Sequence, residues 1–258
     1  MELTSLQYLL GAGSGGLVGF TLGLVGGGGS ILAVPLMVYL VGVPSPHVAI
    51  GTSALAVAVN AATGLLPHAR AGNVKWRCAA LYAAAGVLGA FGGSTIGKAF
   101  DGEKLLLLFA LLMLVVGVLM LRGREYIGNP AVQLSRENAP RLLGFGALTG
   151  GFSGFFGIGG GFLIVPGLIA ATGMPMLNAV GSSLVAVATF GLTTSLNYAA
   201  SGLIDWPLAA IFIAGGILGG LGGARTARQL SAKKGLLNSV FATIIFIVAG
   251  YMIWQSLS

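Results

Sequence analysis

Eight apolar stretches of this sequence have about the length that a helix needs to cross a lipid bilayer. None has an Asp, Glu, Lys or Arg in its central part: 3–25, 48–66, 78–96, 105–121, 142–156, 179–197, 207–224 and 236–257. A helix spans the hydrocarbon core of a bilayer with about 20 apolar residues. Only 7% of the residues are charged, far fewer than in soluble domains, and 56% are hydrophobic. The pattern predicts an all-α polytopic membrane protein whose surroundings are the lipid bilayer.

Charge and cysteine content argue against several other classes of protein. The net charge of +7 comes from basic residues in short loops between apolar stretches, a pattern of membrane orientation rather than of nucleic-acid binding. Cys78 is the only cysteine, so the chain forms neither an intramolecular disulfide nor a cysteine metal cluster. The sequence has no clustered nucleophile, base or metal-ligand set. We therefore expect no enzyme activity, no metal and no cofactor.

Two halves of the chain repeat one pattern. Residues 25–35 read VGGGGSILAVP, and residues 156–166 read FGIGGGFLIVP. A shift of about 131 residues aligns these glycine clusters together with later glycine, proline, tryptophan and Ser/Thr positions. A long polar stretch separates the two copies and is the natural linker. The predicted units are a first membrane repeat, a cytoplasmic linker and a second membrane repeat: 1–121, 122–141 and 142–258.

Loop charge indicates how the two repeats are oriented. Eight plain crossings would divide the 13 basic residues 7 against 6 between the two sides of the membrane. If each repeat crosses an odd number of times, loops 67–77, 122–141 and 225–235 share one side and carry 11 of the 13. The positive-inside rule assigns that side to the cytoplasm. The sequence therefore predicts two inverted repeats of about four to five membrane segments each, with both termini external.

An odd number of crossings requires one segment per repeat that does not cross. The apolar pieces 31–41 and 162–171 follow the glycine clusters and are too short to cross alone, since 11 helical residues extend only about 16 Å. Pro44 and Pro175 follow these pieces, and a proline removes a backbone donor and disfavours helix at the residue before it. We expect a broken, re-entrant helix in each repeat, interrupted at these prolines.

The glycine clusters are candidates for an anion site. No lysine follows them and no strand precedes them, so neither is a nucleotide-binding loop. Half-helix N-termini inside a membrane offer unpaired N–H groups and the positive end of the helix dipole. The alternative is that glycines only allow close helix packing, as for the pair Gly89 and Gly93. The candidate substrate-binding residues are Gly26, Gly28, Gly29, Ser30, Thr52, Ser53, Gly157, Gly159, Gly160, Gly161, Ser182 and Ser183.

The polar side chains of the apolar stretches leave two interpretations open. Their hydroxyl and amide groups either line a polar path or form hydrogen bonds between helices. His47 and His68 are candidates for proton transfer or gating, with interfacial packing as the alternative. The central parts of the spans contain no acid that would coordinate a cation, whereas N–H groups, hydroxyls and basic loops suit an anion. A small anionic substrate is therefore favoured.

The paired motifs GGGGSILAVP and GIGGGFLIVP resemble those of the TauE/SafE family of membrane transporters. A proline turn and then GTS or GSS follow each motif, the segment from His68 to Gly72 fits as well, and the resemblance covers about residues 13–251. It implies transport of sulfite or organosulfonates across the bacterial cytoplasmic (inner) membrane, usually as export. Tyr198 stands in the second repeat where the first has His68, so any role of this histidine is not symmetric.

Together these observations favour a secondary transporter of a small sulfur-containing anion. We expect the substrate to bind between the broken segments near the membrane midplane, and one repeat to rock against the other during alternating access. An anion channel with the same lining is the alternative.

Overall fold

The protein is described by a computed structural model that places residues 4–122, 128–129, 131–158, 161–230 and 234–257. Within these ranges all regular elements are helical, which confirms the predicted all-α class. The elements are α1 (Ser5–Val25), η1 (Gly26–Leu32), α2 (Ala33–Pro35), η2 (Leu36–Leu40), α3 (Pro46–Arg70), α4 (Trp76–Ala99), α5 (Gly102–Arg122), α6 (Ala139–Phe156), α7 (Gly161–Thr172), α8 (Met176–Ala199), α9 (Trp206–Leu230) and α10 (Lys234–Leu257).

Several of these helices have the properties of membrane spans. Each of the eight apolar stretches coincides with one helix. Four helices in the described ranges are long and apolar enough to cross a membrane: Pro46–Arg70, Trp76–Ala99, Met176–Ala199 and Trp206–Gly223. Large apolar side chains also point outward, for example Leu88 and Leu218, which are 77% and 73% exposed. Such surfaces are stable in lipid, so the chain is a multi-pass membrane protein.

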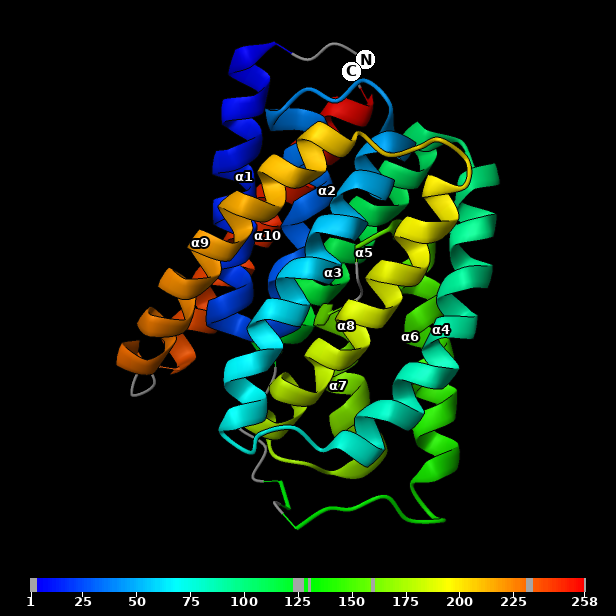
Figure 1. Cartoon of the computed structure of the whole chain (residues 1–258), viewed down its shortest axis with the longest axis vertical. Coiled ribbons are helices and arrows are strands. Elements are labelled where there is room, and N and C mark those ends of the chain that lie inside the picture. Colours follow the sequence, from blue (N-terminus) through cyan, green and yellow to red (C-terminus); the bar gives the residue numbers. More distant parts are fainter. Residues whose placement is uncertain (1–3, 123–127, 130, 159–160, 231–233, 258) are drawn as a thin grey trace.

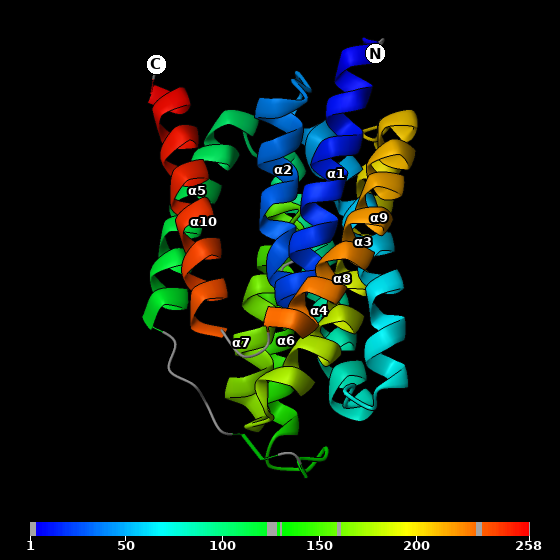
Figure 2. The ribbon, with the colours of Figure 1, turned by 90° about the vertical axis from the view of Figure 1, so that its left-hand side faces the viewer.

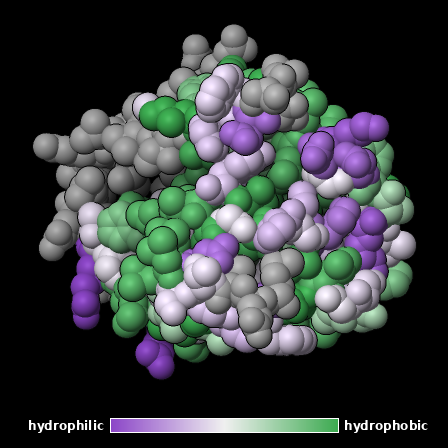
Figure 3. Space-filling model, turned by 90° about the horizontal axis from the view of Figure 1, so that it is seen from above, coloured by the Kyte–Doolittle hydropathy of each residue, from purple (hydrophilic) through white to green (hydrophobic). Residues whose placement is uncertain are grey.

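The helices run between two ends of the molecule (Figures 1 and 2). The N- and C-termini lie at one end, which we call the terminal end. Residues 128–138, which connect α5 to α6, lie at the other, which we call the linker end. Hydrophilic residues are scattered among hydrophobic ones over the terminal end (Figure 3).

The chain turns back on itself once in each half. α1 runs from the terminal end towards the linker end, residues 26–40 run back, and α3 starts again at the terminal end (Figure 1). In the second half α6 starts at the linker end, α7 returns to it, and α8 starts there (Figure 1). Each half thus contains four long helices and one short returning segment, at the positions where the sequence predicts a broken helix.

The first short segment is irregular, whereas the second is a continuous helix. Residues 26–32 form a 3₁₀-helix, one α-helical turn ends at Pro35, and residues 36–40 form a π-helix. Proline lacks an N–H, so Pro35 interrupts the regular hydrogen-bond pattern there. The second segment stays α-helical from Gly161 to Thr172 even though it contains Pro166.

Pro44 and Pro175 lie beyond the two short segments rather than inside them. Both precede the next long helix, and Pro175 is the N-cap residue of α8. The turn before each proline contains a glycine with positive φ, Gly42 at 78° and Gly173 at 72°. Left-handed glycine reverses the chain, and the following proline keeps the residue before it out of the helix. The prolines therefore separate each short segment from the helix that follows.

Two helix pairs pack backbone against backbone through glycines. In the pair α1–α9, a side chain on Gly19 would collide with the backbone of Gly216. In the pair α4–α6, side chains on Gly89 and Gly93 would collide with the backbone of α6, the latter at Gly151. Small residues allow membrane helices to approach this closely. The packing interpretation of Gly89 and Gly93 is therefore confirmed.

The same packing relations occur in both halves of the chain. α1, the first helix of the first half, packs on α9, and α6, its counterpart in the second half, packs on α4. α3 packs on its counterpart α8, and α5 packs on α10. Each of these pairs therefore combines one helix of the first half with one helix of the second half. In the pair α3–α8 the two helices run antiparallel.

Candidate functional site

The first glycine cluster is held tightly against α1. Gly28, Gly29 and Ser30 are buried, and the hydroxyl of Thr21 in α1 donates a hydrogen bond to the Gly29 carbonyl over 3.3 Å. A Cβ atom on Gly29 would collide with the backbone of Thr21 and Leu22. Gly26 begins the 3₁₀-helix that carries this cluster. Glycine is needed at Gly29 because the backbone of α1 occupies the space of a side chain.

The second glycine cluster joins α6 to α7. Gly157 ends α6 in the left-handed conformation with φ of 68°, and a Cβ atom there would also collide with Ile50 of α3. Gly161 is buried and begins α7. Gly159 and Gly160 lie outside the described residues. The two requirements at Gly157, a positive φ and an absent side chain, explain why this position is glycine.

The two short segments meet inside the molecule. η1 packs against both α7 and α8, and the junction of α6 and α7 packs against α3 at Ile50. The two short segments are thus neighbours, and both pack on α8. Helix ends from both halves of the chain lie in this central region.

Two of the candidate hydroxyl groups hold loops in place. The Thr52 hydroxyl on α3 accepts a hydrogen bond of 3.0 Å from the backbone N–H of Asp205, just before α9. The Ser182 hydroxyl on α8 accepts one of 2.9 Å from the N–H of Lys75, just before α4. A shift of 130 residues relates Thr52 to Ser182 and Lys75 to Asp205, so the two bonds are equivalent with the halves of the chain exchanged. Each hydroxyl thus holds the start of a helix that belongs to the other half of the chain.

The adjacent serines bond only within their own helices. The Ser53 hydroxyl donates to the Ile50 carbonyl over 3.1 Å, and the Ser183 hydroxyl donates to the Val180 carbonyl over 2.8 Å. Both serines are fully buried. Ser53 lies one turn from Ile50 on α3, so it is on the side of the helix that approaches Gly157. The Ser53 side chain therefore lies on the side of α3 that faces the junction of α6 and α7.

The candidate hydroxyls form two groups rather than one. Gly51 of α3 packs against Tyr198, which lies 16 residues along α8 from Ser182. Sixteen residues of helix extend about 24 Å. Thr52 and Ser53 therefore lie towards the terminal end, and Ser182 and Ser183 towards the linker end.

The two histidines lie at opposite ends of α3. His47 follows the N-terminus of the helix, and the centroid of its ring is 6.3 Å from that of Tyr198. His68 lies in the last turn of α3, towards the linker end. A direct proton exchange between the two is excluded by the length of α3, about 30 Å over the 21 residues between them.

We expect the Thr52 hydroxyl to contribute to stability and the Ser53 hydroxyl to contribute little. Thr52→Val keeps the side-chain shape and removes the acceptor of the Asp205 N–H, which should lower the free energy of unfolding by about 1 kcal/mol. Ser53→Ala is the matched control, because its hydroxyl bonds only within α3. Thermal unfolding in detergent measures both, and equal melting temperatures would contradict the loop-holding role.

Two polar groups were absent from the sequence prediction. Tyr82 of α4 shares a hydrogen bond of 2.7 Å with Thr149 of α6, and its hydroxyl lies against Gly167 of α7. Lys98 of α4 forms hydrogen bonds to Asn197 and Ser201 at the terminal end. The position of Lys98 at the end of an apolar stretch is a sequence signal, but its partners lie about 100 residues further along the chain.

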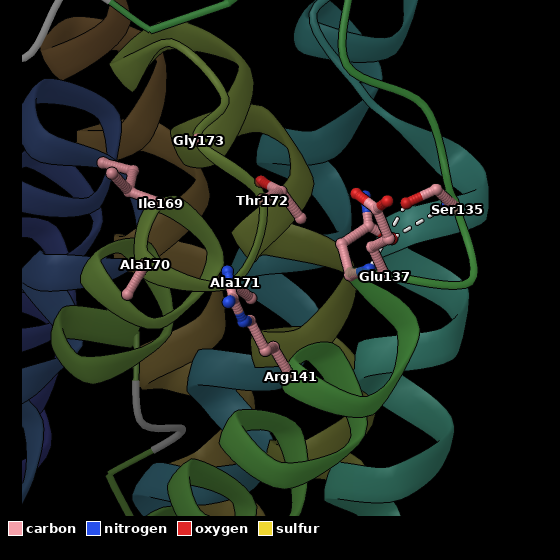
Figure 4. A pocket seen from close by; sticks show the side chains of 9 residues that line it. Ser135, Glu137, Arg141, Ile169, Ala170, Ala171, Thr172 and Gly173 are labelled. Atoms are coloured by element: carbon pink, nitrogen blue, oxygen red, sulfur yellow. Dashed lines mark hydrogen bonds between the residues drawn. The ribbon is translucent and has the colours of Figure 1, made fainter.

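Two clefts open at the linker end. One, of about 640 Å³, lies between the start of α6 and the end of α7, and Arg141, Glu137 and Thr172 are among its lining residues (Figure 4). The other, of about 430 Å³, lies between the start of α4 and residues 132–134. In the described part of the chain no three His, Cys, Asp or Glu side chains group as metal ligands. Both clefts are lined by residues of the linker and of the helix ends beside it.

Comparison with known proteins identifies a family. The family model "Sulfite exporter TauE/SafE" matches residues 11–252. A probable membrane transporter protein of Xylella fastidiosa (strain 9a5c) is 56% identical over 98% of both chains. The probable membrane transporter protein YunE of Bacillus subtilis is 26% identical over 94% of this chain and 96% of its own. No solved structure matches the chain.

Proposed function

The chain belongs to the sulfite exporter TauE/SafE family, and on that premise we propose that it is a secondary transporter of a small sulfur oxyanion. The substrate class is sulfite or an organosulfonate, and the location is the bacterial cytoplasmic membrane. Transport is export by alternating access. The family is one of transporters, and the relatives carry the name of probable membrane transporters.

The observation that carries this proposal is the meeting of the two broken segments. η1 and α7 contact each other inside the molecule, where they approach α3 and α8. Helix ends in a low-dielectric interior present unpaired backbone donors, which favour an anion over a cation. Ser30, Ser53 and the glycines of both clusters are the groups that we assign to the bound substrate. Ser183 lies towards the linker end, so we assign it to the path that leads there. Thr52 and Ser182 support this region from the two ends by holding loops.

The two repeats are inverted in this proposal. Exchange of the repeats converts the pair α1–α9 into α6–α4 and leaves the pairs α3–α8 and α5–α10 unchanged. Counterpart helices also run in opposite directions, since α1 starts at the terminal end and α6 at the linker end (Figure 1). Both relations together are expected of a two-fold axis in the membrane plane. The linker end carries the basic loops, so we assign it to the cytoplasm.

The moving units are helix pairs rather than whole repeats. Rocking one repeat against the other would separate α1 from α9 and α4 from α6, where glycines bring backbones together. We therefore propose that each glycine-packed pair moves as one unit against the central helices α3 and α8.

We expect the two ends of the molecule to be on opposite sides of the membrane. In a Cys78→Ala background, cysteines at the exposed positions Glu103 and Arg225 report on the terminal end and the linker end, respectively. A membrane-impermeant maleimide added to intact cells should label Glu103→Cys, and Arg225→Cys only after lysis. Labelling of both from the same side would contradict the inverted arrangement.

Transport itself is tested with purified protein in liposomes. The anions are sulfite, sulfate, sulfoacetate and taurine, each with and without a pH gradient. We expect flux of sulfite or sulfoacetate above that of protein-free liposomes. Flux of none of the four would refute the proposed function.

A further inference from the structure

A lysine joins α4 to α8 at the terminal end. Lys98 is half-buried in the last turn of α4, and its ammonium donates to the Asn197 carbonyl at 2.9 Å, to Asn197 Oδ1 at 2.8 Å and to Ser201 Oγ at 2.8 Å. An ammonium has three protons, so this set uses all of them. The three acceptors are neutral oxygens, so no carboxylate among them offsets the positive charge.

Asn197 extends the contact to other side chains of α4. Its Nδ2 donates to Ser94 Oγ at 2.6 Å and to Thr95 Oγ1 at 3.0 Å. We call Lys98, Ser94, Thr95, Asn197 and Ser201 the terminal-end cluster. It ties a helix of the first half of the chain to a helix of the second half.

The linker end has a different chemistry at the equivalent positions. A shift of 130 residues places Pro67 at the position of Asn197, Ala71 at that of Ser201 and Ala224 at that of Ser94. The side chains of proline and alanine have no group that can form a hydrogen bond. The repeated fold therefore does not in general require the hydrogen bonds of the terminal-end cluster, because the equivalent positions of the linker end lack polar side chains for them.

Two buried hydroxyls of α8 have no partner in the described residues, and one of them belongs to a side chain beside Lys98. Tyr198 and Thr194 of α8 are fully buried, and the hydroxyls of both make no hydrogen bond there. Lys98 Nζ lies 5.9 Å from the centroid of the Tyr198 ring. Thr194 is four residues before Tyr198, so both lie on one side of α8. An unpaired buried hydroxyl costs about 1–3 kcal/mol, which a ligand that accepts its proton would offset.

We propose that Lys98, Tyr198 and Thr194 form an oxyanion-binding site at the terminal end. A bound oxyanion replaces the neutral oxygens around Lys98 and so releases α4 from α8. An ionised acceptor attracts the ammonium more strongly than a neutral oxygen does, and partial burial increases that attraction. This inference rests on the proposed function, since the oxyanion is the transported substrate on its way through the terminal end.

The binding test compares two lysines at the same end of the molecule. Lys98→Met removes the charge from the cluster, and the exposed Lys104→Met makes the same change of net charge nearby. We expect Lys98→Met to raise the dissociation constant of sulfite for the purified protein at least about tenfold. Lys104→Met should stay within about twofold because water and salt screen an exposed charge, and Lys98→Arg should keep most of the affinity.

The release step has a separate readout. Ser94 of α4 is buried against Asn197 of α8, so a cysteine there, close to serine in size, reports on separation of α4 from α8. In a Cys78→Ala background, sulfite and Lys98→Met should each speed the labelling of Ser94→Cys by a water-soluble maleimide. Asn197→Asp keeps the size of the side chain and gives Lys98 a carboxylate. It should slow the labelling and weaken sulfite binding together.

The outcomes distinguish this inference from the proposed function. If the wild-type protein transports sulfite and Lys98→Met binds it as tightly as Lys104→Met does, the Lys98 site is refuted and the transporter stands. If sulfite leaves the labelling of Ser94→Cys unchanged, the release step is refuted. If the wild-type protein neither binds nor transports any of the four anions, the proposed function fails and the site fails with it.

Discussion

Gly29→Val is expected to destabilise the protein strongly. A Cβ atom at this position collides with the backbone of Thr21 and Leu22 in α1, and backbone atoms cannot move aside as a flexible side chain can. Inserting bulk into a packed interior typically costs about 1–3 kcal/mol, and this collision places the variant at or above the upper value. The melting temperature in detergent should fall by roughly 6–12 °C.

Gly13→Val is the matched control for that change. Gly13 lies in the same helix, α1, and a Cβ atom there meets nothing within 4 Å. We expect its melting temperature to stay near that of the wild type. Sulfite affinity is measured on the folded fraction of both variants. If Gly29→Val kept its melting temperature and lost sulfite binding, the glycine would serve the substrate rather than the packing.

Gly93→Leu should be similarly damaging, for a reason that belongs to the helix pair α4–α6. Its Cβ atom would collide with the carbonyl of Gly151 and lie 3.0 Å from the N atom of Phe155. The two helices would have to separate along their shared face, which should lower the free energy of unfolding by about 3 kcal/mol or more.

The neighbouring Gly92→Leu serves as the control. Gly92 is exposed, and a Cβ atom there meets nothing within 4 Å. Leucine favours helix over glycine by roughly 0.8 kcal/mol, so the control should be neutral or slightly stabilising. Equal melting temperatures of the two variants would show that α4 and α6 do not pack as described.

The repeated glycine and proline pattern was enough to predict the short returning segments. Apolar length set the long helices, and pieces 31–41 and 162–171 were too short to be among them. A left-handed glycine followed by proline is a local signal, so Gly42 and Gly173 could be read as turns from neighbouring residues alone. The predicted class and helix positions needed no knowledge of which helices touch.

The roles of individual polar residues depended on contacts between distant parts of the chain. Thr52 was a candidate for substrate binding, but whether its hydroxyl is available depends on Asp205, 153 residues away. The space beside Gly29 depends on how closely η1 returns to α1, which composition does not encode. Lys98 stood at the end of an apolar stretch, and only the parallel packing of α4 and α8 places Asn197 next to it.

The most direct measurement is sulfite counterflow in proteoliposomes. Liposomes loaded with unlabelled sulfite are placed in a trace of radiolabelled sulfite, and uptake of the label is followed over time. A carrier that alternates between two sides exchanges substrate faster than it returns empty, so we expect internal sulfite to speed the uptake of label and to produce a transient overshoot. Uptake of label at a rate independent of internal sulfite, without an overshoot, would contradict alternating access and identify an anion channel.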